Sequence, residues 1–191
     1  MTRVVVSGTH ASGKSTLVSD LAAACAPAEV LPDPFELVDD AAAEPDASTF
    51  VEQMHVAAAR LEEVSGPGRL VVAERGPLDL LAYLDALVDL GRPTADPAAA
   101  DDARETVARA MDGVDLVLVL DPDDVPEPED EDPDLRAAMH EALLVLLDDP
   151  DLLGGATVVD VAGPRRSRLE QALRAIGEAD SRRPGNVGPP T

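Results

Sequence analysis

The chain has 191 residues, the size of one ordinary domain, and a formal net charge of −23 at pH 7. Such a charge disfavours nucleic acid and anionic membrane surfaces as partners, because phosphates are bound through Lys and Arg patches. No apolar run reaches the ~18 residues that would span a bilayer, no signal peptide is recognisable, and the single cysteine cannot form an internal disulfide, so we expect a cytoplasmic protein.

Apolar runs typical of buried strands alternate along the chain with segments of helical periodicity. Aromatic residues make up only 2% of the chain, so its core must consist of Ala, Val and Leu. Strands are predicted at residues 3–7, 29–31, 69–73, 115–121 and 156–161. Helices are predicted from the glycine-rich turn to Cys25 and at 47–64, 77–90, 97–112, 134–147 and 165–179. This alternation predicts an α/β fold, with a parallel sheet covered by helices on both faces.

The first strand runs directly into the segment GTHASGKS, Gly8 to Ser15, which fits the phosphate-loop pattern G-x-x-x-x-G-K-[ST]. Glycines allow backbone N–H groups to turn inward around phosphates, and the following helix adds its positive N-terminal end. Lys14, the only lysine of the chain, is expected to reach the β- and γ-phosphates, and the Ser15 hydroxyl to bind Mg²⁺. The predicted nucleotide contacts are Gly8, Thr9, His10, Ala11, Ser12, Gly13, Lys14, Ser15 and Thr16. The loop therefore predicts binding of ATP, or another nucleoside triphosphate, with Mg²⁺.

The phosphate loop and the polar residues at the strand ends resemble the P-loop nucleoside and nucleotide kinases, and more closely the small AAA-type ATP-binding proteins of the same fold. The resemblance covers residues 1 to about 176 and is most specific at the phosphate loop. It implies a three-layer sandwich around a five-stranded parallel sheet of order 2-3-1-4-5. One P-loop NTPase domain would occupy residues 1–176, with an acidic loop and lid helix at about 121–148, and residues 177–191 would form a disordered tail.

By this resemblance, acidic and basic residues after the second and third strands take part in the reaction. Asp33 would contact the acceptor or act as the base, although its place in PDPF also suits a turn. Glu74 would orient Mg²⁺ and Arg75 would hold a phosphate or the acceptor, unless the two form only an internal ion pair. Asp121, at the end of the fourth strand, is the rival metal carboxylate. Phe35 either stacks on an acceptor ring or belongs to the core.

Two further segments correspond to the lid and to the adenine site of the family. Arg136 and His140 lie four residues apart, on a helix face predicted to be opposite Met139 and Ala142. Arg136 would reach the γ-phosphate when the lid closes, whereas His140 fits a solvated or ion-paired residue better. In AGPRRSR, residues 162–168, either Arg166 or its neighbour Arg165 would lie on the adenine ring, or the segment is only a solvated helix start.

Three functions fit this sequence. The first is an ATP-dependent kinase acting on a small molecule such as a nucleoside or nucleotide. The second is a regulatory protein that hydrolyses its nucleotide slowly and binds a protein partner, which the single lid arginine and the acidic loop favour. The third is a degenerate nucleotide-binding scaffold, which the intact phosphate loop disfavours.

Overall fold

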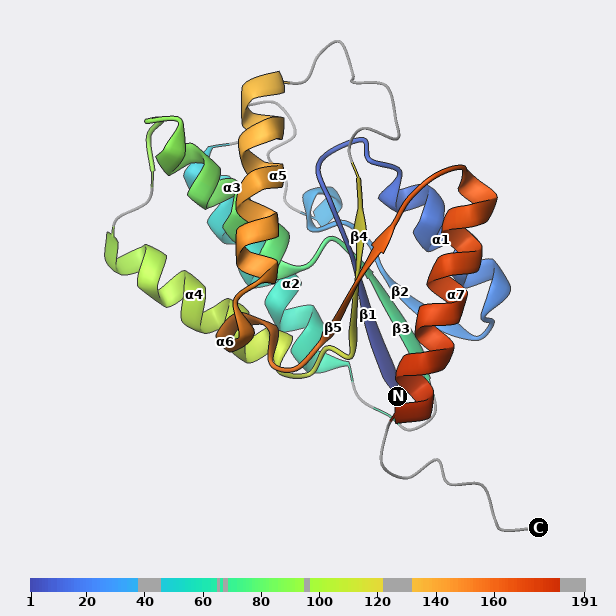
Figure 1. The fold of residues 1–191 in the computed structure, drawn as a ribbon. Coiled ribbons are helices and arrows are strands. Elements are labelled where there is room, and N and C mark those ends of the chain that lie inside the picture. Colours follow the sequence, from blue (N-terminus) through green and yellow to red (C-terminus); the bar gives the residue numbers. More distant parts are fainter. Residues whose placement is uncertain (38–45, 65, 67–68, 95–96, 122–131, 183–191) are drawn as a thin grey trace, which may run out of the picture.

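The computed structural model describes residues 1–37, 46–64, 66, 69–94, 97–121 and 132–182 (Figure 1). Five strands form one sheet in the order β2-β3-β1-β4-β5, and all neighbouring pairs are parallel. The strands are β1 (Thr2–Ser7), β2 (Ala28–Leu31), β3 (Leu70–Glu74), β4 (Leu116–Leu120) and β5 (Thr157–Val161). The helices are α1 (Lys14–Ala24), η1 (Pro34–Leu37, a 3₁₀ turn), α2 (Ala47–Glu63), α3 (Pro77–Asp89), α4 (Pro97–Met111), α5 (Pro133–Leu147), α6 (Pro150–Leu153) and α7 (Arg165–Arg182).

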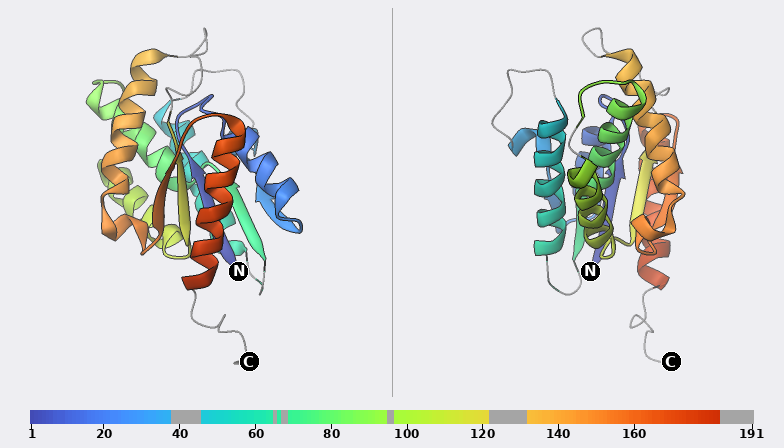
Figure 2. Two further views of the ribbon diagram at one scale, coloured as in Figure 1. Left: turned by 45° about the vertical axis from the view of Figure 1, so that its right-hand side comes forward. Right: turned by 90° about the vertical axis from the view of Figure 1, so that its left-hand side faces the viewer.

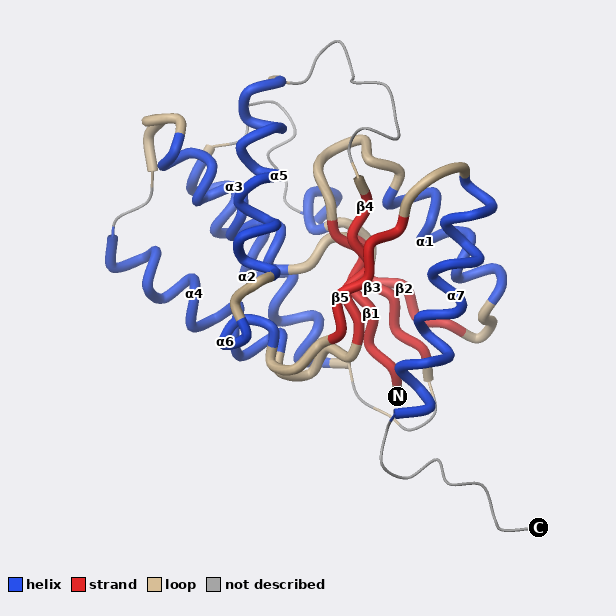
Figure 3. Tube along the Cα trace, in the orientation of Figure 1, coloured by secondary structure: helices blue, strands red, loops and turns tan. Residues whose placement is uncertain are grey.

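Helices cover both faces of this sheet, as Figures 2 and 3 show. The three valines of the central strand β1 illustrate why: Val4 and Val6 face one apolar cluster and Val5 the other, and all three are fully buried. Helices α1 and α7 supply the first cluster, and α2, α3, α4 and α5 supply the second. A strand that is apolar on both faces is stable only in the middle of such a sandwich.

The predicted three-layer α/β sandwich and its strand order are confirmed. Each predicted strand lies within two residues of an observed one, while η1 and the short helix α6 were not predicted. The predicted acidic loop falls largely on residues 122–131, outside the described residues. Helix α7 includes residues 177–182 of the predicted tail, and the rest of that tail is not described. None of the helices in the described part of the chain is long and apolar enough to cross a membrane.

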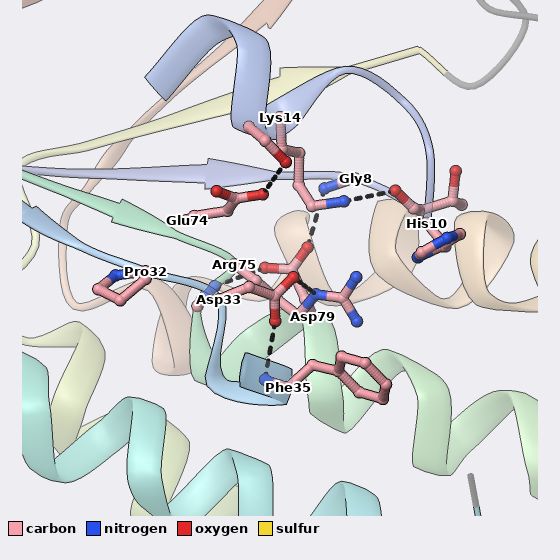
Figure 4. A network of polar contacts seen from close by, with 12 residues as sticks. Gly8, His10, Lys14, Pro32, Asp33, Phe35, Glu74, Arg75 and Asp79 are labelled. Atoms are coloured by element: carbon pink, nitrogen blue, oxygen red, sulfur yellow. Dashed lines mark hydrogen bonds and ion pairs between the residues drawn. The ribbon is translucent and has the colours of Figure 1, made fainter. Parts of the chain in front are cut away.

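The strand order brings together the residues that follow β1, β2 and β3. These strands are neighbours and parallel, so their carboxyl ends lie along the same edge of the sheet. Ligands of open α/β sheets bind at this edge. The phosphate loop, Asp33, Glu74 and Arg75 all lie there (Figure 4).

Candidate functional site

The phosphate loop begins with a residue that must be glycine. Gly8 has a φ of +144°, and a Cβ atom there would come within 2.9 Å of the Ser12 Oγ and 3.0 Å of the Leu120 carbonyl oxygen. Gly13, with a φ of 94°, immediately precedes α1. The loop therefore turns sharply into the helix N-terminus, where unpaired backbone N–H groups and the helix dipole favour a phosphate.

Lys14 lies inside the loop rather than on its surface. Its side chain is 4% exposed, and its Nζ donates a hydrogen bond of 2.6 Å to the Thr9 carbonyl oxygen. Burial, together with the nearby Arg75 guanidinium, lowers the pKa of Lys14 to about 8. A buried ammonium that donates to a neutral carbonyl oxygen can exchange this bond for one to an anion.

The rest of the loop provides a cradle of mostly buried groups. Thr9 and Ser12 are fully buried, and their hydroxyls have no hydrogen-bond partner within the described residues. His10 is exposed, and its backbone N–H donates to the Tyr83 hydroxyl. Thr16 is exposed on the first turn of α1.

The predicted Mg²⁺ ligands are adjacent in space. The Ser15 hydroxyl donates a hydrogen bond of 2.5 Å to the Glu74 carboxylate, across 59 residues of sequence. Both groups offer hard oxygen ligands, the kind that Mg²⁺ takes alongside substrate phosphates and water. The residues therefore fit a Mg²⁺ ion. Asp121, the rival carboxylate, is exposed just beyond β4.

Asp33 and Arg75 form a mostly buried ion pair beside the loop. Arg75 Nε lies 3.2 Å from Asp33 Oδ2, and the two side chains are 7% and 15% exposed. The Arg75 guanidinium also lies over the Tyr83 ring, 5.5 Å from its centroid, and Tyr83 stacks on Phe50 at 4.7 Å. Arg75 has a φ of 63°, a conformation that a non-glycine residue adopts only when its surroundings require it. The ion pair with Asp33 and the contact with the Tyr83 ring together fix the orientation of the Arg75 side chain.

Phe35 extends this corner toward solvent. Its backbone N–H donates a hydrogen bond of 3.1 Å to Asp33 Oδ1, so η1 begins on the same carboxylate that pairs with Arg75. The Phe35 ring is 49% exposed, and so it is not part of the core. Figure 4 shows Phe35, Asp33, Arg75 and Lys14 around one corner of the molecule.

Asp79 is a site residue that the sequence analysis missed. Its fully buried carboxylate accepts hydrogen bonds from the backbone N–H groups of Gly8 (2.8 Å) and Gly76 (2.9 Å) and from the Ser7 hydroxyl (2.8 Å). It therefore joins the start of the phosphate loop to the start of α3. The available signal was its place two residues after Pro77, where a carboxylate can cap the first turn of a helix.

Arg168 was also missed as an individual residue. It is 6% exposed on α7, and its guanidinium donates to two carbonyl oxygens, that of Ser12 (2.8 Å) and that of Gly163 (2.9 Å). One side chain thus joins the phosphate loop to the loop after β5. Because the first contact spans 156 residues, no local pattern indicates it.

Arg136 lies on the buried face of α5. The predicted position, on the face opposite Met139, is wrong: Arg136 is 7% exposed and shares the buried face with Met139 and Leu143. This helix packs against α3 through a broad surface. His140 is half-buried, and its Nδ1 has no hydrogen-bond partner in the described chain.

The two arginines predicted to hold adenine are both in exposed ion pairs. Arg165 makes two hydrogen bonds with Asp20 of α1. Arg166 is 91% exposed and pairs with Glu170 one turn further along α7. Both stand at the N-terminus of α7, at the same loop that Arg168 fastens to the phosphate loop.

Comparison with known proteins agrees with this geometry. The sequence model of a family described as an AAA domain matches residues 3–168. The chain belongs to this family. A search of curated proteins gave no match. As a member of the AAA domain family, the chain has the fold of P-loop kinases, as the resemblance implied.

Solved structures show the same fold at low sequence identity. Thymidylate kinase from Candida albicans aligns with a TM-score of 0.66 and 16% identity, over 94% of this chain and 92% of that one. Deoxyadenosine kinase from M. mycoides aligns with a TM-score of 0.63 and 11% identity, over 92% and 98%. The NadR protein, solved in complex with NR, aligns with a TM-score of 0.63 and 22% identity, over 98% of this chain and 53% of NadR. The chain thus spans about half of NadR.

Proposed function

We propose that this protein is an ATP-dependent phosphotransferase that phosphorylates a hydroxyl group of a small molecule such as a nucleoside or nucleotide. The observation that carries the proposal is the juxtaposition of two sites at one sheet edge. One is the phosphate loop with Lys14, and the other is the buried Asp33–Arg75 pair beside it. A donor site next to an acid–base corner is what phosphoryl transfer requires.

The donor ATP would be held by the phosphate loop from Gly8 to Thr16. Its backbone N–H groups and Lys14 would bind the phosphates, with Lys14 giving up its bond to the Thr9 carbonyl. Ser15 and Glu74 would hold Mg²⁺, which neutralises charge on the phosphates when it is bound. Arg166, at the start of α7, would lie on the adenine ring, as the resemblance to the family implies.

In the proposed reaction the acceptor hydroxyl oxygen bonds to the γ-phosphorus while the bond from that phosphorus to the β–γ bridging oxygen breaks. The hydroxyl proton passes to Asp33, the phosphorylated acceptor forms, and ADP leaves with the bridging oxygen. Arg75 orients Asp33 and stabilises the negative charge at the acceptor side.

The test is to incubate the protein with Mg²⁺, ATP and a panel of nucleosides, nucleotides and sugars, and to identify phosphorylated products by mass spectrometry. We expect one class of acceptor to raise ADP formation well above the background. Lys14→Ala should abolish product, and Asp33→Asn should lower kcat by at least about 100-fold, the range of a lost general base. If ATP binds but no acceptor raises its turnover, the proposal fails and a slowly hydrolysing regulatory protein becomes the better description.

A further inference from the structure

We call the surroundings of Asp33, Phe35 and Arg75 the acceptor corner. The charged side chains there indicate whether the acceptor itself carries a phosphate. Fold similarity does not decide this, because a thymidylate kinase and a deoxyadenosine kinase align about equally well, with TM-scores of 0.66 and 0.63. A bound phosphate is held by Arg or Lys through charge-assisted hydrogen bonds. The cations at this corner therefore distinguish a nucleoside acceptor from a nucleotide acceptor.

Two arginines contact Pro32 and Asp33, the residues between β2 and η1, and both already have partners. Arg75 pairs with Asp33, lies over the Tyr83 ring and is 7% exposed. Arg60 of α2 donates a hydrogen bond of 3.0 Å to the Pro32 carbonyl oxygen, and so supports the backbone just before Asp33. An acceptor phosphate would compete with Asp33 for Arg75 and with the Pro32 carbonyl for Arg60.

Among the described residues, the other basic groups near this sheet edge have partners or roles elsewhere. In the proposed reaction Lys14 exchanges its bond to the Thr9 carbonyl for the phosphates of the donor ATP. Arg168 donates to the Ser12 carbonyl of the phosphate loop, and Arg136 is buried and has a partner of its own. The sequence of residues 38–45 has three acidic residues and that of residues 122–131 has six, and neither stretch has a basic one. These stretches cannot supply a cation wherever they lie.

The exposed groups at the corner include carboxylates and one aromatic ring. Glu36 is exposed next to Phe35, and Glu74 is partly exposed at the end of β3. The chain has three aromatic residues, and two of them, Phe50 and Tyr83, are buried in a stack. The third, Phe35, is 49% exposed beside Asp33 (Figure 4). A flat ring that bears no negative charge fits this surface.

We infer that the acceptor is a phosphate-free alcohol with a flat ring, neutral or cationic: a nucleoside rather than a nucleoside monophosphate. This inference rests on the proposed phosphotransferase function and narrows its substrate. A phosphate at the corner would compete with Asp33 for Arg75 and would be repelled by the exposed Glu36 carboxylate. An uncharged hydroxyl needs only Asp33 and Arg75 as they are.

The experiment compares matched pairs of acceptors, each nucleoside against its own 5′-monophosphate, with the full chain and saturating Mg²⁺-ATP. We expect kcat/KM for the nucleoside to exceed that for the monophosphate at least tenfold with whichever base is preferred. Isothermal titration with each acceptor in the presence of ADP measures the same preference as binding. The binding experiment separates recognition of the acceptor from the rate of transfer.

Two substitutions test whether charge is the cause. Glu36→Lys introduces a cation at the corner and should raise the monophosphate-to-nucleoside ratio of kcat/KM severalfold. Glu63→Lys makes the same charge change at the far, exposed end of α2, and should leave the ratio unchanged. Phe35→Ala should raise KM for the nucleoside more than it lowers kcat, because it removes ring contact and leaves Asp33 in place.

The outcomes separate the two proposals. Equal or better use of monophosphates, or an unchanged ratio in Glu36→Lys, overturns the inference about the acceptor while the phosphotransferase proposal stands. If ATP binds but neither member of any pair is bound or phosphorylated, the proposed function itself fails, and the inference fails with it.

Discussion

The carboxylate of Asp79 accepts a hydrogen bond of 2.8 Å from the backbone N–H of Gly8, 71 residues earlier in the chain. Gly8 is the first residue of the phosphate loop, and Asp79 lies in the first turn of α3. The same carboxylate also accepts hydrogen bonds from the Ser7 hydroxyl and the Gly76 backbone N–H. The loop after β1 and the loop after β3 are therefore both hydrogen-bonded to one buried side chain. One buried carboxylate therefore fixes the position of the donor site relative to the segment that carries Arg75.

Removing this carboxylate should destabilise the protein. Asp79→Ala leaves two backbone N–H groups and one hydroxyl buried without an acceptor, and each such group costs about 1–3 kcal/mol. We expect the free energy of unfolding, measured by urea denaturation, to fall by about 3 kcal/mol or more. Asp89→Ala, an exposed substitution on the same helix, should change it by less than about 0.5 kcal/mol. Equal effects of the two substitutions would rule out the anchoring role.

Lys14 should make the stability of the nucleotide-free protein depend on pH in the alkaline range. Burial lowers its pKa from 10.5 to about 8, so between these values the folded protein holds fewer protons than the unfolded chain. The free energy of unfolding then rises with pH across this window. Below about pH 8 the lysine is charged in both states, and its burial costs the folded protein about 3 kcal/mol, from the size of the shift.

The measurement compares wild type with Lys14→Met, which has no titrating group at this position. Urea denaturation without nucleotide or Mg²⁺, at intervals from pH 7 to pH 10, gives the difference in unfolding free energy between the two proteins. We expect this difference to move in favour of wild type by about 2 kcal/mol or more as the pH rises, given the shift above. A difference that stays constant with pH contradicts the assignment.

Much of the site was predictable because its signals are local or follow from topology. The phosphate loop is contiguous from Gly8 to Ser15, and its glycine, lysine and serine residues at this spacing are enough to predict its conformation. Asp33 and Glu74 come at the ends of predicted parallel strands, which must converge at one edge. The sequence pattern alone therefore predicted that these residues lie at one edge of the sheet, as they do.

The parts that were missed depend on distant contacts. Arg168 bonds a carbonyl 156 residues away, and nothing in its own helix distinguishes it from the solvated Arg166. Asp79 has the sequence context of an ordinary helix cap, and only its burial under the phosphate loop gives it a second role. Arg136 was placed on the wrong face because helical periodicity counts a charged residue as polar, whereas its long apolar stem can pack inside.

The contact between Arg168 and Ser12 should control the affinity for phosphates. In a planar trans peptide the C=O and N–H bonds point in opposite directions. Arg168 holds the Ser12 carbonyl, and therefore also fixes the direction of the Gly13 N–H. We expect Arg168→Met to weaken ATP binding about tenfold, since a lost charge-assisted hydrogen bond costs about 1.5–3 kcal/mol.

Inorganic triphosphate is the informative second ligand for this variant. If Arg168 acts through the loop, its substitution weakens ATP and triphosphate by similar factors; if it acts on the base, only ATP is affected. Arg174→Met, at an exposed position of the same helix, is the control and should bind both as wild type does. Unchanged triphosphate affinity in Arg168→Met would contradict positioning of the loop.

Glu74 and Asp121 are the two candidate carboxylates for Mg²⁺, and we expect their substitutions to have different effects. Glu74 accepts a hydrogen bond from Ser15, whereas Asp121 is exposed beyond β4. Glu74→Gln keeps the size of the side chain and can still accept from Ser15, but it removes the charge that attracts the ion. We expect it to raise the Mg²⁺ concentration needed for half-maximal ATP turnover at least tenfold, and to leave the affinity for ATP without Mg²⁺ within about twofold, about 0.4 kcal/mol.

Asp121→Asn is the matched substitution, with the same loss of charge at the rival position. It should leave the Mg²⁺ dependence of turnover close to that of wild type, because the charge of an exposed carboxylate is screened by water and salt. Titrating Mg²⁺ against turnover in both variants compares the two carboxylates directly. A large shift in Asp121→Asn together with a small one in Glu74→Gln would instead assign the metal ion to Asp121. The ion would then reach the γ-phosphate from the end of β4.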